Sequence, residues 1–180
     1  DPVVVKTIVT SDLAARIAEK YHCTLVEVLT GFKYIGEQIG LLEKAGRPER
    51  YVFGFEESYG YLSGTYVRDK DAVVASMLIC EMAAYYKKQG KTLLQVLDSL
   101  YAEHGVYLHT QVNAAFEGEQ GMETMRRLMG SLRQERPREI AGRKVTGFAD
   151  YLNSVKVDEV NGTAIEISLP KSNVLSFSLG

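Results

Sequence analysis

The sequence predicts an α/β fold in which a mainly parallel (mixed) sheet carries helices on both faces, followed by a short, incomplete β-rich segment. Two observations lead to this prediction. Strand-like and helix-like patterns alternate through the first two thirds of the 180 residues, as they do in parallel sheets with crossover helices. After Pro137 strong helical periodicity is missing, and short β-like runs replace it.

The first fifty-five residues alternate regularly between strand and helix. The predicted strands are rich in β-branched and aromatic residues, and the predicted helices have their apolar residues on one side. Ser11 or Asp12 can cap the first helix, and Gly46 with Pro48 ends the second. In chain order the strands are predicted at 3–10, 23–29 and 51–55, and the helices at 13–21 and 33–45.

The middle of the chain follows a polar, glycine-rich loop at 56–71. A helix is predicted at 72–88, and because it is apolar nearly all round we expect it to pack between layers. Thr92 can cap the next helix, which ends at Gly105. Strand character returns at 106–113, and an amphipathic helix is predicted at 122–132.

We expect two domains, with residues 1–140 forming the α/β domain and residues 141–180 the opening part of a second, truncated domain. The second part shows β-like runs at 155–160, 163–169 and 174–179. No internal repeat and no low-complexity tract interrupts either part.

Composition excludes several classes of function. The net charge of −2 argues against nucleic acid as a partner, since such proteins normally carry a basic excess. The longest apolar stretch is far shorter than the roughly 20 residues that cross a bilayer, so no membrane partner is expected. Two cysteines are too few for a disulfide scaffold, which favours a reducing compartment and a cytoplasmic location.

The segment Phe53-Gly54-Phe55-Glu56-Glu57-Ser58-Tyr59-Gly60 is the strongest candidate for a binding site. It places two carboxylates and a hydroxyl directly after a buried parallel strand, where ligands bind in such sheets. A carboxylate such as Glu56 can accept hydrogen bonds from two neighbouring sugar hydroxyls, and Ser58 can add a third contact. The alternative is that Glu56 and Glu57 only cap the strand or face solvent in a connecting loop.

Two further segments could contribute. Thr30-Gly31-Phe32-Lys33 follows the second strand, where Gly31 lets the backbone approach a ligand or simply makes the turn. Arg68-Asp69-Lys70-Asp71 precedes a helix, so its aspartates suit capping, and Arg68 and Lys70 remain as phosphate or hydroxyl donors.

These three segments, in this order and spacing, resemble the third domain of the α-D-phosphohexomutases, the family of bacterial phosphoglucomutases and phosphomannomutases. The resemblance covers nearly the whole chain, as the third domain and the beginning of the fourth. It implies that Glu56 and Ser58 contact the sugar, with Thr30, Gly31, Arg68 and Lys70 as further substrate-binding residues. The family's sugar loop is usually Gly-Glu-x-Ser-Gly, so Phe55 at its first position and Tyr59 before Gly60 are departures.

The resemblance also implies an incomplete enzyme. The family uses a phosphoserine loop, an Asp-rich Mg²⁺ loop and an Arg- and Ser-Gly-Thr-containing phosphate loop, and none of them occurs in the 180 residues. We therefore expect no catalytic residue and no metal site in this fragment. The implied partners are a glucose or mannose phosphate and the missing domains of the same chain, with Mg²⁺ and glucose 1,6-bisphosphate as cofactors of the intact enzyme.

Two rival functions use the same loop. One is a non-catalytic sugar-binding module. The other is a glycosidase with Glu56 and Glu57 as acid and base, but adjacent residues of an extended segment point in opposite directions, which disfavours a facing pair about 5–5.5 Å apart.

Overall fold

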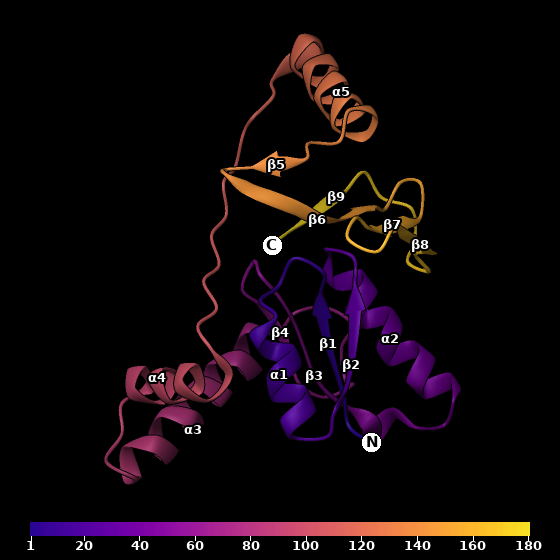
Figure 1. The fold of residues 1–180 in the computed structure, drawn as a ribbon. Coiled ribbons are helices and arrows are strands. Elements are labelled where there is room, and N and C mark those ends of the chain that lie inside the picture. Colours follow the sequence, from indigo (N-terminus) through magenta and orange to yellow (C-terminus); the bar gives the residue numbers. More distant parts are fainter. The chain divides into compact units, whose positions relative to one another are not determined.

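The computed structural model describes residues 1–180 (Figure 1). The chain divides into two compact units, Asp1–Thr110 and Gln111–Gly180. This division groups the helix before Pro137 with the second unit, whereas the sequence predicts a domain boundary at 140. No helix of the chain is both long and apolar enough to cross a membrane.

A four-stranded mixed sheet forms the centre of the first unit, which confirms the predicted α/β class. The strand order is β2-β1-β3-β4, with β1, β2 and β3 parallel and β4 antiparallel to β3. The strands are β1 (Val3–Thr7), β2 (Thr24–Val28), β3 (Tyr51–Glu56) and β4 (Gly60–Leu62). β4 lies inside the predicted loop at 56–71, because a three-residue turn after Glu56 folds the chain back along β3.

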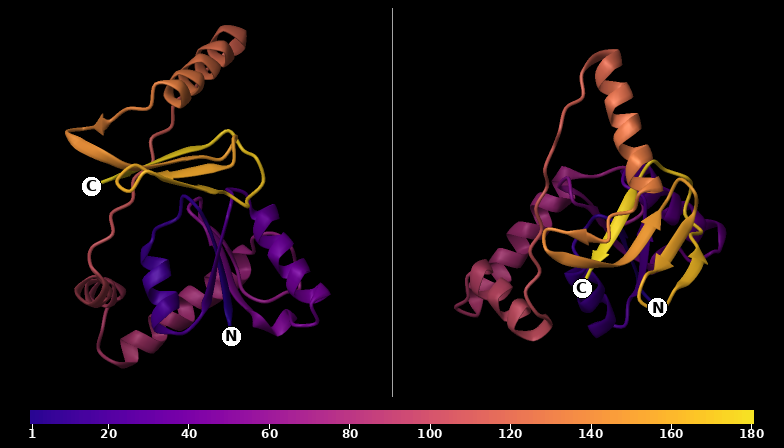
Figure 2. Two further views of the ribbon diagram at one scale, coloured as in Figure 1. Left: turned by 45° about the vertical axis from the view of Figure 1, so that its right-hand side comes forward. Right: turned by 45° about the horizontal axis from the view of Figure 1, so that its top comes forward.

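Helices α1 (Leu13–Lys20) and α2 (Phe32–Lys44) lie on opposite faces of this sheet (Figures 1 and 2). The chain leaves β1 for β2 in one direction and returns past β1 to β3 in the other. Because both crossovers are right-handed, their helices must cover opposite faces. A short 3₁₀ helix, η1 (Pro48–Arg50), leads from α2 into β3.

The core of the first unit lies between the sheet and α2. Its buried residues come from β1, β2, α2, β3 and β4: Val3, Val5, Val28, Phe32, Ile35, Ile39, Tyr51 and Leu62. The Tyr51 hydroxyl donates to the carbonyl oxygen of Leu62 at 3.1 Å, so the buried phenol has a partner. Burial raises the pKa of this phenol well above its ordinary value.

Two later helices have their predicted bounds, but the first of them does not have its predicted packing. α3 (Ala72–Lys88) has no buried residue, so the expected position between layers is wrong. Its main contacts are with β4 and α4 (Leu93–His104), and Val73 and Met77 are left exposed. Thr92 caps α4 in a reciprocal capping box with Gln95, as its sequence predicts.

The strand predicted at 106–113 is also wrong. These residues form no regular element, and no other strand pairs with them. Without a neighbouring strand their β-branched character has no ladder to join, and Leu108 and Val112 are almost fully exposed.

The second unit holds one helix and a five-stranded antiparallel sheet, as the β-rich pattern predicts. The elements are α5 (Gly118–Gln134), β5 (Glu139–Ile140), β6 (Arg143–Asp150), β7 (Val155–Asp158), β8 (Thr163–Glu166) and β9 (Leu175–Leu179). β6 is central and pairs with β5, β7 and β9, although it was not among the predicted runs. The Asp150 carboxylate accepts from Arg133 Nε at 3.1 Å and from the Leu152 amide at 3.0 Å.

Candidate functional site

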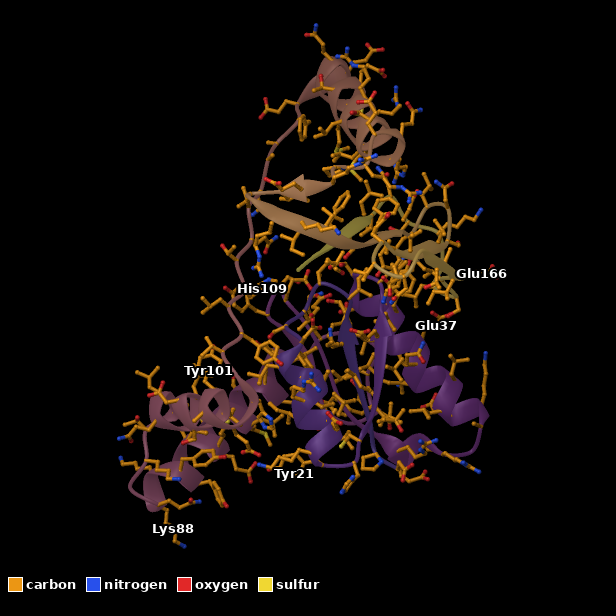
Figure 3. All side chains as sticks on the ribbon, viewed as in Figure 1. Tyr21, Glu37, Lys88, Tyr101, His109 and Glu166 are labelled. Atoms are coloured by element: carbon orange, nitrogen blue, oxygen red, sulfur yellow. The ribbon has the colours of Figure 1, made fainter.

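The carboxyl ends of β1, β2 and β3 meet at one edge of the mixed sheet, because the three strands are parallel (Figure 1). Crossovers leave β1 and enter β3 on opposite faces, so the chain diverges between these two strands. Ligands of open α/β sheets bind at this kind of divergence. Figure 3 shows Glu37 of α2 toward this edge and Tyr21, after α1, at the opposite one. The candidate site therefore lies where Thr7 ends β1 and Glu56 ends β3.

Glu56 is a largely buried residue of this edge, with 7% of its surface exposed. No hydrogen bond or ion pair within the chain engages its side chain. Gly60 lies opposite Glu56 in the β3–β4 ladder, and a β-carbon on Gly60 would come within 2.8 Å of Glu56 Oε1. The glycine thus leaves the space that the carboxylate occupies. Neither of its oxygens is fully buried, so the carboxylate is accessible and, without internal donors, is suited to accept hydrogen bonds from a ligand.

Three residues, Glu57, Ser58 and Tyr59, form the turn between β3 and β4. Glu57 Oε2 accepts a hydrogen bond of 2.7 Å from the hydroxyl of Thr7, which is fully buried. Ser58 is exposed, and Tyr59 adopts a left-handed conformation with φ of 62°. The turn therefore presents the Ser58 hydroxyl to solvent, while Glu57 anchors it to β1.

The turn after β1 is held by a buried lysine. Lys6 is fully buried, and its ammonium lies 2.7 Å from Glu27 Oε1 and 3.3 Å from Asp12 Oδ1. It also donates to the carbonyl oxygen of Thr10 at 3.0 Å. Asp12 thus pairs with Lys6 instead of capping α1, and Ser11 Oγ accepts the Leu13 amide at 3.3 Å in its place.

The loop after β2 begins α2 without a capping side chain. Thr30 is exposed, and Gly31 has φ of 119°, a conformation that favours glycine. Lys70 lies above the ring of Phe32, with its ammonium 5.9 Å from the ring centre. The structure therefore brings Lys70 to the loop that contains Thr30 and Gly31.

Arg68 is engaged by other parts of the protein. Its guanidinium donates to Glu43 Oε1 on α2 and to the carbonyl oxygens of Thr65 and Val67. The Arg68 carbonyl oxygen lies against Gly36, where a β-carbon would come within 2.6 Å of it. In this structure Arg68 attaches the loop before α3 to α2.

The two aspartates beside Lys70 are both ionised more readily than usual. The Lys70 backbone amide and its ammonium lower the pKa of Asp69. The Tyr66 hydroxyl and the Val73 amide lower the pKa of Asp71. Asp71 caps α3 by accepting from the amides of Val73 and Val74, at 2.7 Å and 3.3 Å, as predicted.

The predicted residues fall into two groups. Glu56 and Ser58 lie together at the end of β3, and Lys70 lies with Thr30 and Gly31 near the start of α2. No hydrogen bond or ion pair joins the groups. Sequence reasoning missed Thr7 at this edge, and only the divergence between the first and third predicted strands could have pointed to it.

No group of three or more His, Cys, Asp or Glu side chains could hold a metal ion. A cavity of about 660 Å³ lies between the β3–β4 hairpin and α3, lined mainly by apolar residues that include Phe53, Tyr61 and Ile79. Its lining suits packing more than sugar binding.

Comparisons with known proteins agree on one family. The family described as phosphoglucomutase/phosphomannomutase, α/β/α domain III, matches residues 1–104. The phosphoglucomutase of Staphylococcus haemolyticus (strain JCSC1435) is 38% identical over 173 residues, covering 96% of this chain and 31% of the relative. That of Staphylococcus aureus (strain USA300) is 38% identical over 171 residues, covering 95% and 30%. The chain thus spans less than a third of the length of these curated relatives.

A solved structure shares the fold. The open form of pp63/parafusin, a phosphoglucomutase from Paramecium, aligns with 97% of this chain and 28% of its own, with a TM-score of 0.55 and 21% identity.

Proposed function

The chain belongs to the phosphoglucomutase/phosphomannomutase family, as its α/β/α domain III, and on this premise we propose that it is the sugar-recognition part of a phosphohexomutase. The whole enzyme would interconvert hexose 1-phosphate and hexose 6-phosphate through a phosphoserine enzyme and a bisphosphate intermediate. In this proposal Glu56 and Ser58 bind the sugar, and no catalytic residue lies in these 180 residues.

The observation that carries the proposal is the Glu56 carboxylate, whose residue is largely buried at the end of β3 while its oxygens reach the surface without a donor from the chain. A sugar offers neighbouring hydroxyl donors, and a carboxylate can accept two of them. Hydrogen bonds to a charged acceptor are about twice as strong as neutral ones. The exposed Ser58 hydroxyl, two residues on, adds a contact that can donate or accept.

The proposed reaction sets a demand that this pair can meet. The bisphosphate must turn over between two phosphoryl transfers, so one surface has to bind the ring in two opposite orientations. The C3 and C4 hydroxyls exchange places when the ring is flipped, and Glu56 with Ser58 can accept either arrangement. Such a site does not touch C2, where glucose and mannose differ.

The remaining predicted residues have supporting roles in the proposal. Lys70, held near Thr30 and Gly31, is a cation for the substrate phosphate. The guanidinium of Arg68 pairs with Glu43, so a phosphate would compete with that carboxylate. In the proposal, Mg²⁺ and glucose 1,6-bisphosphate are cofactors of the whole enzyme. None of the roles proposed for the residues of this chain involves the metal. A cytoplasmic location stays a prediction.

The test is an NMR titration of the 180-residue chain with three sugar phosphates. Glucose 1-phosphate and its C2 epimer mannose 1-phosphate should shift the same amides at 56–60, and the C4 epimer galactose 1-phosphate should bind more weakly. Glu56→Gln should abolish these shifts, whereas Glu49→Gln, at an exposed position of η1, should keep them. Absence of shifts at 56–60, or shifts that persist in Glu56→Gln, would contradict the proposal.

An activity assay tests the prediction that these 180 residues alone do not catalyse the mutase reaction. With glucose 1,6-bisphosphate and Mg²⁺ supplied, the chain alone should convert glucose 1-phosphate to glucose 6-phosphate no faster than buffer. Turnover above that background would show that the chemistry does reside in these residues.

A further inference from the structure

Fifty residues apart in sequence, Thr7 and Glu57 meet at the edge of the sheet. The Thr7 hydroxyl is completely buried, and it donates to Glu57 Oε2 at 2.7 Å. Glu57 begins the turn whose other members are Ser58 and Tyr59. This bond is the side-chain link from β1 to that turn.

The hydroxyl of Thr10 extends this link. The oxygens of Thr7 and Thr10 lie 2.7 Å apart, and geometry alone allows either to be the donor. A hydroxyl has one proton, and an ionised carboxylate only accepts. Because Thr7 gives its proton to Glu57, Thr10 must donate to Thr7. The three groups form one directed chain, in which each bond polarises the next.

The turn after β1 is itself fixed. The Thr10 amide donates to the Thr7 carbonyl oxygen at 3.1 Å, and the Lys6 ammonium donates to the Thr10 carbonyl oxygen at 3.0 Å. Lys6 is in turn paired with Glu27 on β2. Thr10 is therefore a fixed donor, and the chain of hydroxyls starts from a rigid part of the protein.

The turn between β3 and β4 is held in place on both sides of Ser58. Glu56 is set by the β3–β4 ladder and by the space at Gly60. Glu57 is set by Thr7. Without the second point, the exposed Ser58 would sit in a three-residue turn held only at its ends, and its hydroxyl would have no defined place beside Glu56.

We propose that Thr7 and Glu57 are positioning residues, which hold Ser58 beside the Glu56 carboxylate without touching the sugar. The role of Ser58 and Glu56 rests on the proposed function, but the effect of the pair on the turn does not. Two residues of a single hydrogen bond should act as a unit, so their substitutions should not add.

The experiment measures the turn and the ligand separately in the 180-residue chain. Amide exchange of Ser58 and Tyr59 reports the turn, and NMR titration with glucose 1-phosphate reports binding. The variants are Thr7→Val, which removes the hydroxyl at similar volume, Thr7→Ser, which keeps it, Glu57→Gln and the double variant Thr7→Val/Glu57→Gln. Thr24→Val, at an exposed position of β2, is the matched control.

Thr7→Val should speed exchange at Ser58 and weaken glucose 1-phosphate binding by about tenfold, as the loss of one hydrogen bond to a charged group predicts. Thr7→Ser should restore both readouts, and the double variant should be no worse than the poorer single variant. Thr24→Val should match the wild type. Glu56→Gln should lose binding with unchanged exchange at Ser58, which separates a ligand contact from a positioning residue.

Additive effects in the double variant, or unchanged Ser58 exchange in Thr7→Val, would overturn the proposal. If buried Thr7→Val does not fold, the exchange rates of the partly exposed Glu57→Gln variant decide the same question. If the wild type binds no sugar phosphate, the proposed function fails, and the exchange measurements still decide whether the pair orders the turn.

Discussion

The carboxylate of Glu56 occupies the space beside Gly60 that any other residue's β-carbon would need. A β-carbon on Gly60 would lie 2.8 Å from both Cγ and Oε1 of Glu56, well inside contact distance. The two residues face each other across the β3–β4 ladder. The placement of this carboxylate and the identity of the residue opposite are therefore one structural requirement.

Gly60→Ala should displace the Glu56 carboxylate and weaken binding of glucose 1-phosphate. The added methyl group has no free space, and the side chain that must move is the proposed sugar ligand. NMR titration of the variant checks this. Gly40→Ala is the control, since a β-carbon there meets nothing within 4 Å. Unchanged affinity in Gly60→Ala would show that Glu56 does not need its present position.

Gly36→Ala and Gly40→Ala should change stability in opposite directions, although both lie in α2. Alanine at 40 should raise the free energy of unfolding by about 0.5–1 kcal/mol, because it is the better helix former. Alanine at 36 should lower it, since its β-carbon would come within 2.6 Å of the Arg68 carbonyl oxygen. Urea unfolding measures both. A stabilised Gly36→Ala variant would mean that the loop carrying Arg68 gives way without cost.

In a full-length enzyme containing this chain, Glu56→Gln should lower kcat/KM by about 10²-fold, since a hydrogen bond to a charged group contributes about 1.5–3 kcal/mol and acts in both half-reactions. Ser58→Ala should cost less, about 0.5–1.5 kcal/mol for a neutral bond. Steady-state kinetics with glucose 1-phosphate tests the order of the two effects. An unchanged kcat/KM in Glu56→Gln would show that Glu56 does not bind the sugar and has a structural role only.

Asp150 should make the second unit sensitive to acid. Although burial opposes ionisation, hydrogen bonds from Asn153 and Arg133 hold the pKa of Asp150 below its ordinary value of 3.8. The folded state therefore binds this proton less readily than the unfolded state. Its contribution is fully present well above pH 3.8 and is lost as the pH falls through the lower, folded-state pKa.

Asp150→Asn tests this contribution. At pH 7 the variant should lose about 1.5–3 kcal/mol of stability, the usual value of hydrogen bonds to a charged group. The loss should shrink at pH 3. Glu166→Gln, at an exposed position of β8 (Figure 3), should change little at either pH. An equal loss of stability at both pH values would show that the charge of Asp150 does not contribute to stability.

Hydrogen exchange should be faster in the later strands of the second unit than in β1 and β3. β8 is exposed at every position and pairs on one edge only, with β7. A strand with an open edge and no covered face has few contacts to resist local opening. Amides from about Val155 onward should exchange quickly in a dilute monomer. Uniform protection across both units would show that the second folds as a complete domain.

Local pattern predicted much of this protein correctly. The alternation in the first fifty-five residues predicted three parallel strands with two helices, and the bounds of α3 were predicted without error. Thr92 and Asp71 were identified as helix caps, since capping depends on residues two or three positions away. Glu56 and Ser58 were placed together because they are only two positions apart in the chain.

Partners distant in sequence were decided only by the tertiary structure. The sequence places Asp12 where a helix cap is expected, but in the fold its carboxylate pairs with the buried Lys6 ammonium. The sequence offers no partner for Arg68, but in the fold its guanidinium pairs with Glu43 of α2. The residues at 106–113 have strand character but no strand to pair with. Thr7 and Glu57 meet because the strand order places β3 next to β1. Periodicity and capping act within a few residues, whereas which side chains share a hydrogen bond across fifty residues depends on how the sheet is ordered.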